Sequence, residues 1–307
     1  MSAFPLPAFG HSTPLRVPWS VGLRVSRPLE NYPRILYLFT RSDLKTIVLP
    51  VTFFAYLASP STTPDRMLFA MLWTWLHLLQ FCVSNQSMDP EEDSSNKPWR
   101  PIPSSLISVD NARNLRWMLL PLCISVSVRL EAYWQGMSLA LAFLAHNEFG
   151  LHSHLFMRNI CNAWGYASFN AGAFAIASGQ STVTTRTMIS FAINALIIIS
   201  TIYAQDFRDE VGDKRMGRQT IPILWPKGSR IGIFMALAAW SICLSWACGL
   251  CSFFSVPFCA WAMFVGLRFF WKRTAEADQR SYRYYNIWLA AAQVVHVPVI
   301  AAALSHL

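Results

Sequence analysis

The feature that most constrains this chain is a series of long stretches without a single charged residue. A helix that crosses the hydrocarbon layer of a membrane needs about 20 mostly apolar residues. The uncharged stretches are of that order, and one of them is long enough for two crossings. They cover residues 46–64, 67–88, 132–147, 159–185, 187–205, 231–267 and 284–307. This pattern predicts a membrane protein with many helical spans.

Composition supports the same conclusion. Apolar residues make up 54% of the 307 residues and charged residues only 13%, and the mean hydropathy is +0.33. Soluble globular proteins carry about 25% charged residues. The 13 Trp, 21 Phe and 9 Tyr residues exclude a disordered chain. Seven scattered cysteines do not form the framework of a disulfide-rich module.

These stretches give eight spans, because the run 231–267 holds two. The uncharged run 117–128 is short, but extended over residues 114–130 it can form a ninth span if it is tilted or buried. The fold class we predict is therefore all-α, a polytopic membrane protein with about nine transmembrane helices. The run 231–267 is divided near 249–257, because Pro257 lacks a backbone N–H. Residues 1–42 have no apolar core of a secretory signal and are expected to be a cytosolic N-terminal segment. The transmembrane domain that carries the candidate site is expected at 43–307. The spans lie at roughly 44–60, 66–86, 112–130, 132–148, 159–179, 187–205, 229–249, 252–271 and 284–304.

The basic residues test this count of spans. Cytoplasmic loops of membrane proteins carry an excess of Lys and Arg. With the N-terminus inside and nine crossings, all but three of the 25 basic residues fall on the inside. The three exceptions are Arg66, Arg129 and Arg186. The net charge of +9 is therefore explained by loops facing an anionic membrane surface, and no nucleic-acid partner is expected.

Half of the 16 acidic residues lie in two short stretches. Each stretch directly follows a predicted span, and both fall on the inside face. In the first, Asn85, Asp89 and Asp93 are spaced i, i+4, i+8, which aligns side chains on one helix face. Pro90 should loosen the helix just after Asp89. The second stretch repeats this alignment with spacing i, i+3, i+7 in Asp206, Asp209 and Asp213.

Rows of carboxylates at a membrane surface are unfavourable unless a positive charge lies between them. Mg²⁺ prefers hard oxygen ligands, usually one or two carboxylates together with substrate phosphates. Basic residues follow each row and are expected to contact a diphosphate; they are Lys97 and Arg100 after the first, and Lys214, Arg215 and Arg218 after the second. The alternatives are two solvated loops or a Ca²⁺ site.

These motifs resemble those of the UbiA-type intramembrane prenyltransferase superfamily. The first family motif, N-x-x-x-D-x-x-x-D, matches Asn85, Asp89 and Asp93. The second, together with its flanking residues, matches Tyr203, Asp206, Asp209, Asp213, Gly217, Arg218 and Thr220. The resemblance implies nine transmembrane helices around a central cavity. It also implies that the six motif residues Asn85, Asp89, Asp93, Asp206, Asp209 and Asp213 hold Mg²⁺, which binds an isoprenoid diphosphate and promotes its ionisation to an allylic cation.

The segment after the first motif departs from the usual acceptor-transferring members. Its form, E-E-D-x-x-N-K-P-W-R-P-I-P over residues 91–103, resembles the fungal branch that includes membrane-bound terpene cyclases. The resemblance implies an enzyme that ionises a linear C15 or C20 diphosphate, farnesyl or geranylgeranyl, and cyclises the cation. The catalytic residues are then Asp89, Asp93, Asp206, Asp209 and Asp213, and Lys97, Arg100, Lys214 and Arg218 bind the diphosphate. The alternatives are transfer to an aromatic or quinone-precursor acceptor, or a membrane transporter.

Further expectations concern the interior and the location of the chain. Asn162, Asn170 and Asn194 lie within spans and are expected to bond neighbouring helices, although a pocket role stays open for Asn170. We expect the protein in the endoplasmic reticulum, with the motif loops cytosolic, in preference to the mitochondrial inner membrane. The sequence leaves the oligomeric state open. Aromatic residues expected to line the cavity are Trp73, Trp75, Phe81, Phe143, Phe149, Trp164, Tyr166, Phe169 and Tyr203.

Overall fold

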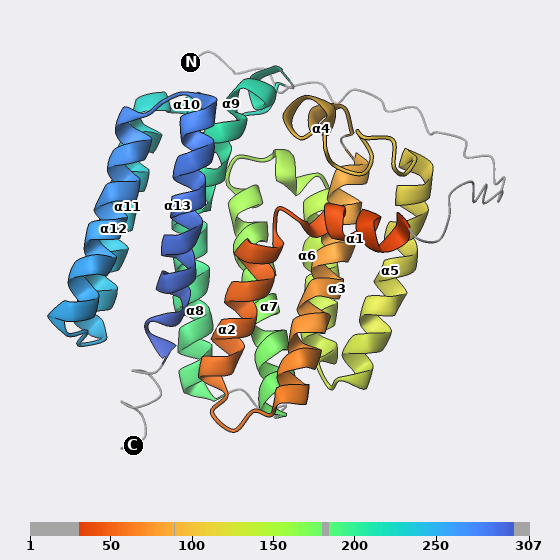
Figure 1. Cartoon of the computed structure of the whole chain (residues 1–307), viewed down its shortest axis with the longest axis horizontal. Helices are drawn as coiled ribbons and strands as arrows, with labels where there is room; N and C mark the ends of the chain where they lie inside the picture. The colour runs from red at the N-terminus through yellow and green to blue at the C-terminus, as the bar shows by residue number, and fades with distance from the viewer. Residues whose placement is uncertain (1–30, 89, 180–183, 216, 298–307) are drawn as a thin grey trace, which may run out of the picture.

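The computed structural model describes residues 31–88, 90–179, 184–215 and 217–297. Within these ranges the regular elements are all helices, which confirms the predicted all-α class. The long helices run side by side as a bundle (Figure 1). They are α2 (Leu49–Ala58), extended at its start by a π-helical turn (Leu44–Val48), α3 (Pro64–Met88), α5 (Val109–Arg129), α6 (Tyr133–Asn147), α7 (Met157–Ser178), α8 (Thr185–Thr201), α11 (Pro226–Ala247), α12 (Ser252–Trp271) and α13 (Ala275–Val294).

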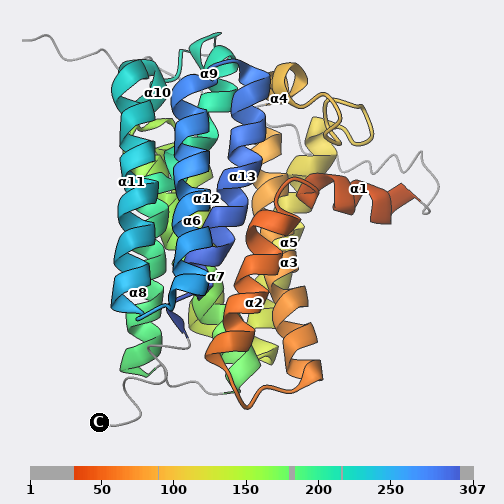
Figure 2. The same ribbon diagram turned by 60° about the vertical axis from the view of Figure 1, so that its left-hand side comes forward.

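Short helices lie before and between the long ones, most of them outside the apolar spans predicted from the sequence. They are α1 (Tyr32–Thr40), α4 (Pro90–Asn96), α9 (Asp206–Arg215), α10 (Ile221–Leu224) and two 3₁₀ turns at Leu151–Ser153 and Ile202–Gln205. Of these, α1 lies roughly across the direction of the long helices (Figure 2). Its Ile35 and Phe39 are buried, while Tyr32 and Tyr37 are exposed. The helix thus packs one face on the bundle and leaves the other outside.

Each of the nine predicted segments overlaps one long helix, with shifted ends. The largest shift is at α13, which begins at Ala275 where residue 284 was expected. The backbone N–H of Ala277 donates to Thr274 Oγ1 at 3.2 Å and fixes that start. The helix α13 therefore begins with polar and charged turns, which precede its apolar part. In the described residues, four helical stretches are long and apolar enough to cross a membrane: Pro64–Met88, Thr187–Arg215, Pro226–Ala247 and Ser252–Trp271.

The turn between α11 and α12 corrects one expectation. The break lies at residues 248–251, and Pro257 is inside α12 rather than at the break. Pro257 is tolerated because it lies in the second turn, where its missing N–H removes one hydrogen bond to the first turn. The chain reverses instead at Gly249, whose φ of +56° is left-handed. The N–H of Leu250 then bonds the Ser245 carbonyl at 3.0 Å.

Two apolar cores fill the bundle. The first joins residues of α1, α2, α3, α5, α6 and α7, and the second joins residues of α7, α8, α9, α11, α12 and α13. α7 therefore contributes to both cores. A Cβ on Gly172 would overlap the Trp73 ring, so the glycine permits the close approach of α7 to α3. Tyr166 on α7 also reaches the π-helical turn before α2, where its hydroxyl donates to the Thr46 carbonyl at 3.1 Å.

The helices that carry the two acidic motifs lie at the same end of the bundle. Figure 1 shows α4 and α9 there, and α4 contacts α9 directly. The connections α2–α3 and α11–α12 lie at the opposite end. Segments separated by more than one hundred residues are thus brought together at one end of an apolar bundle, as the sequence predicted.

Candidate functional site

The first motif spans the junction between α3 and α4. Asp89 lies outside the described residues, and Asn85 is half-buried on the last turns of α3. Asp93 is buried on α4, and both of its carboxylate oxygens accept from Arg100 Nη1, at 2.6 and 2.8 Å. Such charge-assisted hydrogen bonds are shorter and stronger than those between neutral groups. Pro90 begins α4, as expected for a residue that cannot continue α3.

Lys97 follows directly after α4, where its N–H bonds the Asp93 carbonyl at 2.8 Å. Burial lowers the pKa of the Lys97 ammonium group, and the nearby Arg100 guanidinium acts in the same direction. The carboxylate of Asp209, from the second motif, opposes this shift. The first motif therefore presents a cation to the second, and an anion bound between them would stabilise the charged form of Lys97.

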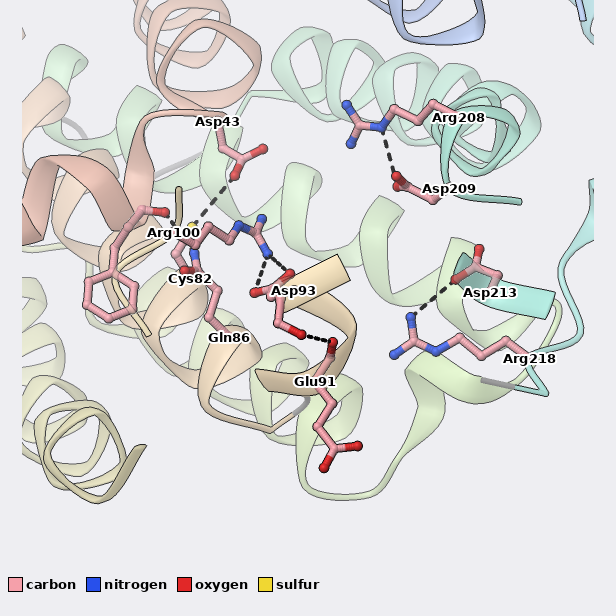
Figure 3. Close-up of polar contacts among 12 residues, drawn as sticks. Asp43, Cys82, Gln86, Glu91, Asp93, Arg100, Arg208, Asp209, Asp213 and Arg218 are labelled. Atoms are coloured by element: carbon pink, nitrogen blue, oxygen red, sulfur yellow. Dashed lines mark hydrogen bonds and ion pairs between the residues drawn. The ribbon is translucent and has the colours of Figure 1, made fainter. Parts of the chain in front are cut away.

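The second motif forms α9, and each of its three aspartates has an arginine partner. Asp206 Oδ1 lies 3.0 Å from Arg158 Nη1, and Asp209 Oδ2 lies 3.3 Å from Arg208 Nε. Asp213 Oδ1 lies 3.4 Å from Arg218 Nη1. Together with Asp93 and Arg100, these pairs form the acid–arginine cluster; Figure 3 shows three of its four pairs, drawn from both motifs.

Lys214 differs from the other basic residues proposed for the site. Its side chain is 53% exposed, and its ammonium group lies 2.6 Å from Glu210 Oε1, one turn earlier on α9. Such an i, i+4 pair is typical of a solvated helix face. Arg100 and Arg218, by contrast, are held against carboxylates of the cluster.

Sequence reasoning missed three charged residues of this end of the bundle: Asp43, Arg158 and Arg208. Asp43 lies between the motifs, accepts from Cys82 Sγ at 3.8 Å and interacts electrostatically with Arg100 and Arg208 (Figure 3). Arg158 reaches Asp206 from the start of α7. All three fall on the predicted inside face, and this placement could have pointed to them. Asp43 and Arg158 lie outside the two acidic stretches, however, and Arg208 is a basic residue between Asp206 and Asp209.

The donor chemistry of the cluster fits Mg²⁺. Carboxylate oxygens are its preferred protein ligands, and Asp213 Oδ2 is a buried oxygen that has no hydrogen-bond partner among the described residues. Among the residues that the structure describes, no group of three His, Cys, Asp or Glu side chains is assembled as a metal site. A Mg²⁺ ion that takes one or two carboxylates and completes its shell with diphosphate and water does not require such a group.

Comparison with known proteins decides the family. The model of the UbiA prenyltransferase family matches residues 47–290. The chain belongs to this family. Fumagillin beta-trans-bergamotene synthase of Aspergillus fumigatus is 28% identical over 276 residues, 87% of this chain and 93% of that protein. A diterpene cyclase of Hericium erinaceus is 28% identical over 284 residues, 86% of this chain and 88% of that protein.

A solved structure of a UbiA homolog from Archaeoglobus fulgidus, bound to GPP and Mg²⁺, has the same fold. The two superpose with a TM-score of 0.61 over 85% of this chain and 99% of that one, at 13% identity. The resemblance to the UbiA superfamily and to its terpene cyclase branch is therefore confirmed. This protein is therefore a membrane-embedded enzyme of the family that includes terpene synthases and prenyltransferases.

Proposed function

We propose that this UbiA chain is a Mg²⁺-dependent terpene cyclase. It takes a linear C15 or C20 prenyl diphosphate, ionises it, cyclises the carbocation and loses a proton, within terpenoid secondary metabolism. The observation that carries the proposal is the acid–arginine cluster, which joins two motifs at one end of an apolar bundle. The similarity to terpene synthases over most of both chains supports it.

The residues of the site fall into two groups, those with oxygen ligands for a metal and those with a positive charge for the diphosphate. Mg²⁺ would be held by Asn85, Asp89, Asp93, Asp206, Asp209 and Asp213, and when bound it neutralises the charge that develops on the leaving diphosphate. Lys97, Arg100 and Arg218 would bind diphosphate oxygens. Lys214 would join them only by leaving its pair with Glu210 on the exposed side of α9. Because Arg100 and Arg218 already lie against carboxylates, they can exchange a carboxylate oxygen for a phosphate oxygen with little movement. The homolog bound to GPP and Mg²⁺ supports this substrate class.

The cation that ionisation leaves needs a dry and polarisable surrounding. Aromatic rings form a continuous series in the first core: Phe81 lies 4.9 Å from Phe143, Phe143 lies 6.1 Å from Phe169, and Phe169 lies 6.4 Å from Trp73. We propose that these rings line one part of the space that holds the prenyl chain. Phe149 was expected to join them, but its side chain is 76% exposed at the end of α6 and takes no part.

We further propose that all nine long helices cross the membrane around a central cavity, with residues 1–42 cytosolic and 43–307 as the catalytic domain. Both motif loops then face the cytosol, and the endoplasmic reticulum is the membrane we assign. The distribution of Lys and Arg supports this orientation.

The orientation predicts the result of labelling from each side. In a variant depleted of its own cysteines, a cysteine at position 94 should react with an impermeant reagent from the cytosolic side. A cysteine at position 252, at the opposite end of the bundle, should react from the other side. Labelling of both positions from one side would contradict the span count.

Transfer of the prenyl group to a separate acceptor is the second candidate, because the family is described as prenyltransferases. The first test is to incubate membranes containing the protein with Mg²⁺ and farnesyl or geranylgeranyl diphosphate, and to analyse the volatile products. A cyclic terpene, absent from control membranes, is expected. A product that forms only when an acceptor is added would favour the second candidate.

A further inference from the structure

Three amide side chains inside the bundle have no hydrogen-bond partner in the described protein. Asn170 on α7, Asn194 on α8 and Gln293 on α13 are each 0% exposed. In all three, both the amide nitrogen and the amide oxygen are unpaired. The expectation that Asn170 and Asn194 bond neighbouring helices is therefore wrong. A buried polar group without a partner costs about 1–3 kcal/mol, so these amides call for a ligand.

One contact between α7 and α8 places two of the amides at the same level. The rings of Phe174 and Phe191 lie 6.1 Å apart and join the two helices. Asn170 precedes Phe174 by one turn, and Asn194 follows Phe191 by one turn. Since α7 and α8 run in opposite directions (Figure 1), both steps lead toward the end that carries the acidic motifs.

A second contact places Gln293 at that level too. Thr201 Oγ1 and Tyr285 Oη lie 2.9 Å apart and join α8 to α13. Asn194 lies two turns before Thr201, and Gln293 lies two turns after Tyr285. These two helices are also antiparallel, so both steps lead away from the acidic end (Figure 1). The three amides, which we call the polar layer, therefore lie at about the same level of the bundle. Asn194 precedes Asp206 by twelve residues, about 18 Å along the helical path at ~1.5 Å per residue.

The ligand of this layer must both donate and accept hydrogen bonds. A prenyl chain does neither. Water does both, and a buried water molecule typically makes about three hydrogen bonds to otherwise unpaired groups. We propose that Asn170, Asn194 and Gln293 bind water inside the bundle, and that this water is the base that ends the cyclisation. The inference rests on the proposed function and assigns its proton-removing group.

A C–H bond beside the cationic carbon breaks, its electron pair forms the new double bond, and the proton passes to the oxygen of the bound water. The resulting hydronium has three O–H donors, and the three amide carbonyl oxygens are its acceptors. The hydronium releases this proton to solvent when the site opens and the products leave, and a water molecule binds in the layer again. The distance of about 18 Å keeps this base away from the ionising end of the substrate.

The test replaces each amide by an apolar side chain of similar size: Asn170→Leu, Asn194→Leu and Gln293→Met. Pyrophosphate release should stay close to that of the wild type, since ionisation takes place at the acidic motifs. The share of the wild-type hydrocarbon among the products should fall at least ~10-fold, because its base is lost. Thr74→Val is the matched control: Thr74 is fully buried, but its hydroxyl already donates to the Ala70 carbonyl at 2.8 Å. Its product profile should not change.

A structure of the wild-type protein at a resolution that shows water provides a second, activity-independent readout. Density for water in contact with at least two of the three amides is expected. Direct bonds between the amides, with no water, would overturn the proposal, and so would an unchanged product profile in all three variants. A wild-type protein that releases no pyrophosphate from any prenyl diphosphate would instead contradict the proposed function.

Discussion

Asp209→Ala is expected to lower turnover of the prenyl diphosphate by at least ~10²-fold, the scale of losing one group that stabilises developing charge. Asp209 lies 3.3 Å from Arg208 and interacts with Lys97 of the other motif. In the proposed site, its loss would remove a Mg²⁺ ligand and leave the Arg208 and Lys97 cations without the carboxylate between them. The measurement is pyrophosphate release by the purified variant at saturating Mg²⁺.

Glu210→Ala is the matched control for Asp209→Ala. It removes the same charge from the next residue of α9, but Glu210 pairs with the half-exposed Lys214. Its rate should remain within a few-fold of the wild type, because surface pairs contribute little. Equal losses in the two variants would mean that net charge, and not the position of the carboxylate, matters. Full activity of Asp209→Ala, or of the wild type in EDTA, would contradict the metal-dependent site.

Breaking the buried ion pair between α11 and α13 should destabilise the fold by about 3–5 kcal/mol. Arg230 donates from both terminal nitrogens to Asp278, at 2.9 and 2.8 Å, and also to the Phe269 carbonyl at 2.7 Å. Both side chains are almost fully buried. Arg230→Met leaves the Asp278 carboxylate without a partner, and thermal unfolding in detergent should shift strongly downward.

The double variant Arg230→Met/Asp278→Leu distinguishes a pair effect from a loss of packing. Removal of both charges avoids an isolated buried carboxylate, so most of the stability should return. A double variant as unstable as the single one would contradict this account. The pair also supports the site, because Arg230 lies 4.5 Å over the ring of Phe207, which directly follows Asp206 on α9. The single variant should therefore lose activity together with stability.

The long helices were predictable because the interior of a membrane imposes one dominant rule on their composition. Uncharged runs located every long helix, and the periodic spacing of carboxylates identified both motifs. The short helices were not predictable in this way. α4 has seven residues and α10 has four, so a hydropathy average over the length of a membrane span cannot detect them. The start of α13 depends on a hydrogen bond to the hydroxyl of Thr274. The turns that follow are polar, so hydropathy alone does not locate this start.

The site was predictable where its residues are neighbours in sequence, and not where the fold brings them together. Asp206, Asp209 and Asp213 share a face of one helix, as their spacing indicated. Residues distant in sequence complete the site: Arg158 of α7 pairs with Asp206, and Asp43, which precedes α2, interacts electrostatically with Arg100 and Arg208. No local pattern marks either residue. The unpaired state of Asn170 and Asn194 likewise depends on how α7 and α8 are rotated, which sequence spacing alone does not specify.

The central claim, internal capture of the cation, is tested most directly by the stoichiometry of the purified enzyme. The protein would be incubated with Mg²⁺ and a single prenyl diphosphate, and pyrophosphate and organic products would be quantified together. Equal amounts of pyrophosphate and a cyclic hydrocarbon are expected, with no increase when a phenol or quinone precursor is added. Pyrophosphate release that appears only with an added acceptor, together with a prenylated acceptor as the product, would contradict the account.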